Sequence, residues 1–209
     1  PSEELYPVID LKTGFRFKVQ LRELANEGAG FLKFLDFLST ETTVRIEENS
    51  KEKDIEKIYL LKFSYFLNDL NTIRGNQSIL QDIFIFENSS DLNFRLRFNE
   101  RKSLTEFSGG AEKGLFTERS VRARLRLVRE FSIQTDVILG ENNLAAPPAS
   151  LRNRKINSTD FVLDFSYRPE NYIETGIILK TGNTKDEYPG TPTELKTNSQ
   201  SLRVNFSFA

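Results

Sequence analysis

The stretch RSVRARLRLVRE, residues 119–130, decides the fold because two kinds of side chain alternate along it. Arginine stands at positions 122, 124 and 126, and apolar residues stand between and beside them. Successive side chains of a β-strand point to opposite faces, whereas a helix would spread these arginines around its circumference. The stretch is therefore predicted to be a strand with one charged face and one apolar face.

The same alternation recurs along the chain. It is clearest in Gly14–Arg22, Asp91–Asn99, Phe131–Leu139, Asp160–Arg168 and Ser201–Ala209. Less regular segments also read as strands, namely Thr40–Glu48, Gln81–Glu87 and Asn171–Thr181. Phe31–Leu38 and Ile55–Leu67 mix helical and strand periods, and either structure fits them. The pattern predicts roughly ten strands.

The connections between these segments predict how the strands are ordered. Turn-forming residues at Asn88–Asp91, Arg129–Glu130 and Arg168–Asn171 predict three tight hairpins. Between the hairpins lie polar stretches rich in Gly, Pro and Asn, predicted to be long loops: 100–118, which contains the glycine-rich Gly109–Gly114, then 140–159 and 182–200. The predicted fold is an all-β, antiparallel up-and-down meander in which short turns alternate with long loops. A single domain is expected, with residues 1–12 as a leading segment and 13–209 as strands.

Composition excludes several kinds of function. The chain has no His and no Cys, so it has no Ser-His-Asp triad, no Cys-His pair and no zinc site built on those residues. Asp160 and Asp164 share the polar side of one strand, but such pairs are usually surface charges. We expect no enzyme, no metal and no cofactor. The net charge is −1, whereas a nucleic-acid binder usually has a basic excess. The aromatic residues are predicted to lie on the face opposite the arginines, and a base-stacking surface needs both together, so no nucleic-acid partner is expected. The sequence contains no run of about 18 apolar residues, so it predicts no transmembrane helix.

Taken together, alternating segments of about nine residues and short hairpins resemble part of a bacterial outer-membrane β-barrel. The resemblance is one of architecture and identifies no particular family. It implies a cell-envelope channel, receptor or secretion-associated barrel in the outer membrane or at the cell surface. Its partners would be membrane lipid, other envelope proteins or remaining strands of the same chain. A chain that begins at Pro1, without Met, is expected to be a piece of a longer or processed protein.

A soluble alternative stays open on the sequence alone. Strands with one solvated face also occur in soluble antiparallel sheets and sandwiches, and such a domain would serve in adhesion or scaffolding. Under either interpretation the arginines are predicted to share one face and to form a positive wall unless carboxylates are interleaved, some of which Asp136, Asp160, Asp164 and Glu174 can supply.

The candidate residues fall into two sets. The charged set, expected to line a lumen, is Arg95, Arg97, Arg122, Arg124, Arg126, Arg168 and Arg203. The apolar set, expected to face lipid or a core, is Phe94, Leu96, Phe98, Leu125, Leu127, Phe161, Leu163, Phe165, Phe206 and Phe208.

Overall fold

The computed structural model describes residues 8–21, 35–52, 54, 56, 66–68, 70–89, 91–147, 152–170, 173–187 and 191–206. Most of Phe31–Leu38 and of Ile55–Leu67, whose period was ambiguous, lies outside these residues. Within the described part, no helix is long and apolar enough to cross a membrane.

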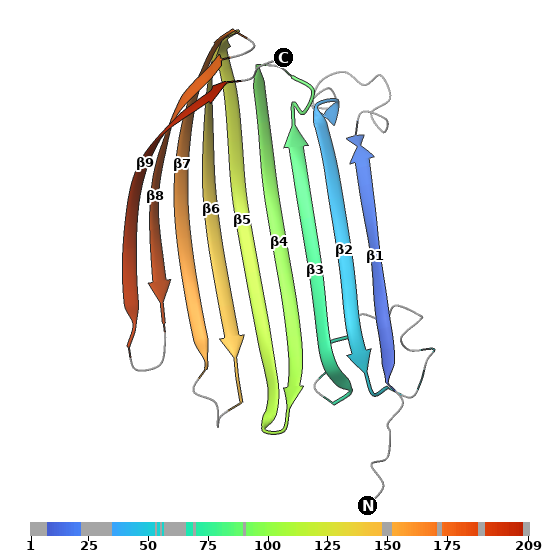
Figure 1. The fold of residues 1–209 in the computed structure, drawn as a ribbon. Helices are drawn as coiled ribbons and strands as arrows, with labels where there is room; N and C mark the ends of the chain where they lie inside the picture. The colour runs from blue at the N-terminus through green and yellow to red at the C-terminus, as the bar shows by residue number, and fades with distance from the viewer. Residues whose placement is uncertain are drawn as a thin grey trace, which may run out of the picture.

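One sheet contains every strand of the described residues. The strands are β1 (Ile9–Gln20), β2 (Leu38–Ser50), β3 (Thr72–Ile85), β4 (Leu92–Phe107), β5 (Gly110–Val128), β6 (Phe131–Ala145), β7 (Arg154–Glu170), β8 (Ile173–Asp186) and β9 (Thr193–Phe206). They lie side by side in chain order, each antiparallel to the next, in one curved sheet (Figure 1). This confirms the all-β antiparallel meander. β1 and β9 are its two edges, so the sheet is open in the described residues.

The predicted long loops 100–118, 140–159 and 182–200 are wrong in extent, because most of their residues belong to strands. β4 and β5 meet in a hairpin with only residues 108–109 between them, and GGAEKG belongs mainly to β5. The connections β6–β7 and β8–β9 span residues 146–153 and 187–192, and both contain more residues than the two-residue connections β5–β6 and β7–β8. Strand pairing depends on backbone hydrogen bonds, so it continues beyond the point where apolar alternation stops. β1 also begins inside the predicted leading segment 1–12.

The pairing register puts the predicted apolar residues on one face. Leu92, Leu125, Ile133, Phe165, Ile177 and Leu202 follow one another across six paired strands. Phe94, Leu96, Phe98, Phe161 and Leu163 lie on the same face in neighbouring rows. Leu127 sits at a register shift and is 53% exposed. Phe206 pairs with Ile173, and Phe208 lies outside the described residues.

Most of this apolar face is uncovered. Val121 is 47% exposed, Ile177 50% and Leu202 75%. Large contiguous patches of exposed apolar surface are uncommon on monomeric soluble proteins. Among the described residues, the buried hydrophobic side chains are few: Phe66 from the β2–β3 connection packs on Val44 and Ile46 of β2, and Leu104 of β4 is buried as well.

The apolar face forms a band that runs obliquely to the hydrogen-bonded rows. In β4 the band ends at Phe98, after which Glu100 and Lys102 point the same way. The row through Phe98 reaches Lys196 in β9, and the apolar residues of β9 begin six positions further on, at Leu202. Six residues at ~3.3 Å over five strand spacings of ~4.8 Å correspond to a tilt of ~40°. Strands of closed barrels tilt by about 35–45° from the barrel axis.

Replacing Ile46 by Ala tests where the packed core lies. Ile46 is only 2% exposed, so the substitution removes buried methyl groups and leaves a cavity. We expect the free energy of unfolding to fall by about 2–4 kcal/mol. The matched control is Leu202→Ala, because Leu202 is 75% exposed and leaves no cavity. Equal losses in the two variants, measured by denaturant unfolding, would contradict this placement of the core.

Candidate functional site

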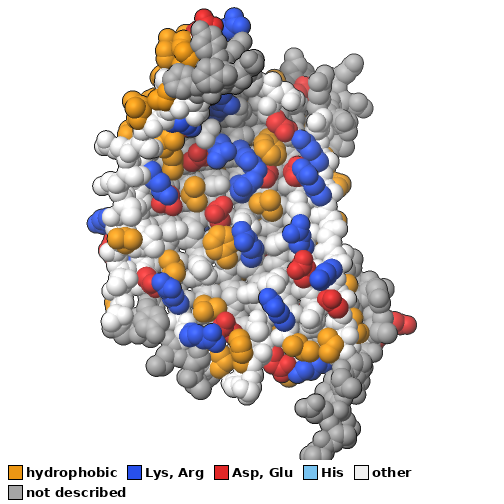
Figure 2. Space-filling model, in the orientation of Figure 1, with side chains coloured by type: hydrophobic (Ala, Val, Ile, Leu, Met, Phe, Trp, Pro, Cys, Tyr) orange, Lys and Arg blue, Asp and Glu red, His pale blue; other side chains and the backbone are white. Residues whose placement is uncertain are grey.

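The charged face is the candidate site. The register places Arg95 and Arg97 of β4 on the same face as Arg122 of β5 and as Asp136 of β6. Arg124, Arg126 and Arg203 share this face. Figure 2 shows basic and acidic side chains interspersed over the sheet on the face toward the viewer. Six of the seven predicted arginines therefore lie on one face, although no contact unites all of them.

Arg168 is the exception. It lies in the last part of β7, where the register shifts between Tyr167 and Glu170, so strand pairing does not assign its side chain to a face. Its main-chain N–H donates a hydrogen bond to the Glu130 carbonyl at 2.6 Å. Its backbone therefore ties the end of β7 to the β5–β6 turn.

Asp82 forms ion pairs with both arginines of the first pair. Arg95 donates to both carboxylate oxygens of Asp82, at 3.0 and 2.8 Å, and Arg97 does the same at 2.9 and 3.2 Å. The Asp82 side chain is only 5% exposed. Such forked, charge-assisted bonds are among the stronger hydrogen bonds in proteins. Sequence reasoning missed Asp82, and the available signal was its position as the one acidic residue among the charged-face positions of β3.

Arg122 is neutralised on the other side. Arg95 and Arg122 stand directly opposite each other in the β4–β5 ladder, an unfavourable arrangement for like charges. Arg122 donates to Asp136 at 2.5 Å, and Gln134 also donates to that carboxylate at 2.9 Å. The two arginines thus turn toward different carboxylates, which relieves the repulsion between them.

Arg203 bridges two strands. It donates to Asp164 at 3.2 and 3.3 Å, to Ser166 at 2.8 Å and to Glu174 at 3.1 Å. Arg203 of β9 reaches Asp164 of β7 across Gly176 of β8. A Cβ at Gly176 would lie 3.2 Å from an Arg203 nitrogen and 2.7 Å from the Phe165 carbonyl, so glycine leaves the room this bridge needs.

The predicted interleaving of acids among the basic residues is confirmed for all four carboxylates. Asp136 pairs with Arg122, Asp164 and Glu174 pair with Arg203, and Asp160 lies 3.7 Å from Lys180. Asp160 and Asp164 thus have a cation each. Among the described residues, no three Asp or Glu side chains come together to hold a metal ion.

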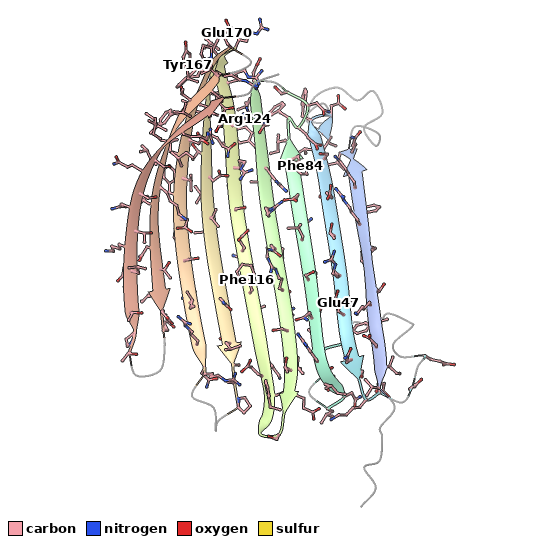
Figure 3. All side chains as sticks on the ribbon, in the orientation of Figure 1. Glu47, Phe84, Phe116, Arg124, Tyr167 and Glu170 are labelled. Carbon is pink, nitrogen blue, oxygen red and sulfur yellow. The ribbon has the colours of Figure 1, made fainter. Side chains whose placement is uncertain are left out.

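Three aromatic rings of the described strands lie on the charged face, contrary to the expected separation of aromatic residues from arginines: Phe84, Phe107 and Phe116. The Arg95 guanidinium lies 5.2 Å from the ring centre of Phe84, and the Arg101 guanidinium lies 5.1 Å from that of Phe116. Figure 3 places Phe84 toward the end of the sheet with the β3–β4 connection, and Phe116 toward the opposite end. Phe84 and Phe116 interrupt the polar alternation of their strands, which is why the pattern did not place them.

The two halves of the charged face differ in how their charges are matched. Asp82 and Asp136 occupy the half toward the β5–β6 turn, where Arg124 and Arg126 face Gln134 and Ser132. The half toward the β4–β5 hairpin contains a hollow of about 440 Å³, lined by Arg45 and Arg101. Sequence reasoning missed these two arginines.

A further ion pair lies at the β3–β4 connection. Ser39 donates to Glu87 at 2.5 Å and Lys18 donates to it at 3.0 Å. The hydrogen bond from Ser39 is the largest single cause that lowers the pKa of Glu87 below its ordinary value of 4.5, and Lys18 lowers it further through a hydrogen bond and its charge. The ionised form is therefore favoured in the folded protein.

No family model, curated protein or solved structure matches this chain.

Replacing Ser39 by Ala tests the cause of the Glu87 shift. The stabilisation that Glu87 contributes is present above its unfolded pKa and is lost as the pH falls through its lower, folded pKa. We expect Ser39→Ala to raise the pKa of Glu87 toward its ordinary value, as followed by NMR titration of the carboxyl carbon. Lys18→Gln is the comparison and should raise this pKa by less. A larger shift in Lys18→Gln would show that the cation dominates.

Proposed function

We propose that this sheet is part of the wall of a cell-envelope β-barrel, with a non-enzymatic role as a channel, receptor or secretion-associated protein. The apolar face would contact lipid, and the charged face would border the aqueous interior. The observation that carries the proposal is the exposed apolar band. It spans seven residues in β4, from Leu92 to Phe98, and nine in β6, from Phe131 to Leu139. Strands that cross a bilayer have about 9–11 such residues.

Two further features support this role. The estimated tilt of ~40° between the apolar band and the strands agrees with the tilt that barrel closure requires. Beyond the band, strands β4–β9 continue toward the β4–β5 hairpin with polar residues such as Lys102, Asn157 and Lys196 on the outer face. This asymmetry suits a barrel whose wall extends out of the bilayer on one side.

A soluble or surface-attached β domain is the second candidate. The contact that favours it is the packing of Phe66 on Val44 and Ile46, because there the chain itself covers the apolar side of the sheet. In that case a protein surface would replace lipid over the rest of the band.

A charged substitution within the band separates the two candidates. We expect Leu163→Arg in β7 to lower the stability of protein folded into lipid vesicles by about 2–4 kcal/mol, because the arginine must enter the apolar layer. The control is Asn157→Arg, on the same face of β7 but beyond the band, where the cost should be about 0–1 kcal/mol. Denaturant titration in vesicles measures both.

The result that would contradict the membrane proposal is a protein that is soluble without detergent. A monodisperse, β-rich protein in detergent-free buffer, with the two variants equally stable, would overturn the membrane proposal and favour the soluble domain.

Ion selectivity in planar bilayers tests whether the charged face borders the aqueous interior. Arg124 faces Asn93 and Gln134 across the ladders, so Arg124→Ala removes a positive charge without breaking an ion pair within the described residues. We expect the permeability ratio of anions to cations to fall. Arg119→Ala removes the same charge from the opposite face of β5 and should leave the ratio unchanged. An unaltered ratio in Arg124→Ala would contradict an interior position for this face.

A further inference from the structure

The hollow on the charged face has the features of a small-molecule site. Its volume of about 440 Å³ lies within the usual range of ligand pockets. Two adjoining rows of paired residues supply most of its lining. One row is Arg45, Ser78, Arg101, Phe116 and Asn142, and the other is Glu47, Asn76, Ser103, Gly114 and Leu144.

Small residues create the hollow. Ser78 stands between Arg45 and Arg101 in the first row, and Ser103 and Gly114 are neighbours in the second. The two arginines belong to strands β2 and β4, so their backbones are separated by about two strand spacings, or ~10 Å. Long basic side chains thus stand on either side of a floor of hydroxyl groups and backbone.

Within the described residues, the arginines of this hollow lack ion pairs of the kind that Asp82 makes with Arg95 and Arg97. Neither Arg45 nor Arg101 makes an ion pair with a carboxylate of the described residues, and both side chains are exposed. Arg101 lies over the Phe116 ring instead. Glu47 is the one carboxylate of the lining, and it is paired in register with Lys12 of β1.

We propose that this hollow binds a small solute through a phosphate-type oxyanion. The guanidinium groups of Arg45 and Arg101 would donate to the oxyanion from two sides, a geometry that suits tetrahedral and planar oxyanions alike. The Ser78 and Ser103 hydroxyls and the Asn76 and Asn142 amides offer further hydrogen bonds. The Phe116 ring and Leu144 give the remaining space an apolar wall.

This inference does not depend on the membrane proposal. Most of the residues that line the hollow belong to the charged face, whichever surface covers the apolar face. If the sheet does border an aqueous interior, the site names the class of solute that this interior would retain.

Titration calorimetry with inorganic phosphate, at constant ionic strength set by chloride, tests the site in the folded full chain. We expect saturable binding, weakened about tenfold or more in Arg45→Gln and in Arg101→Gln, since each removes one charged donor. Arg119→Gln is the matched control: it removes the same charge from the opposite face of β5 and should bind like the parent. Circular dichroism and thermal unfolding confirm that each variant is folded.

Glu47→Gln gives the test a gain of function, which misfolding cannot imitate. Removing the one carboxylate of the lining should tighten phosphate binding several-fold. Absence of saturable binding in the parent chain would overturn the inference, and so would equal weakening in Arg119→Gln or unchanged binding in both arginine variants. None of these outcomes bears on whether the apolar band contacts lipid.

Discussion

The uninterrupted antiparallel ladder is the constraint on which the rest of this structure depends. Paired residues share a face, so each strand fixes the faces of the next, and a slip of one residue would invert every strand beyond it. Among the described strands, the register shifts only between Asn49 and Ser50, between Arg126 and Val128, and between Tyr167 and Glu170, all near strand ends. Two chemically distinct faces therefore persist from β1 to β9.

That separation concentrates like charges on one side of the sheet. Arg95 and Arg122 stand opposite each other, and such an arrangement is tolerable because Asp82 and Asp136 flank them on the neighbouring strands. Arg203 meets its carboxylates by reaching over a glycine. Arg45 and Arg101 make no ion pair with a carboxylate of the described residues, and they stand beside open space that Glu47 also lines. Within the described strands, the same ladder thus produces both arginines with ion pairs and arginines without them.

On the opposite side, the ladder produces an apolar surface far larger than the small core beside Phe66. The boundary of that surface crosses the paired rows, whereas a flat layer aligned with the rows would end at one row. A tilted boundary is what results when strands cross an apolar layer at an angle, as in barrels. The distribution of exposed side chains and the strand geometry therefore lead to the same proposal.

Local alternation in the sequence was sufficient to predict the strand RSVRARLRLVRE, its short turn and the shared face of Arg122, Arg124 and Arg126. It failed in 100–118 because the outer face there turns polar while backbone pairing continues, so the strands lost their apolar period but not their hydrogen bonds. Local alternation also could not predict which side chains the arginines of the charged face contact. Asp82 beside Arg95 and Arg97, and Arg45 across Ser78 from Arg101, depend on the register between segments distant in the chain. Side-chain period determines which face a residue occupies, and only the tertiary pairing of strands decides which charges meet on it.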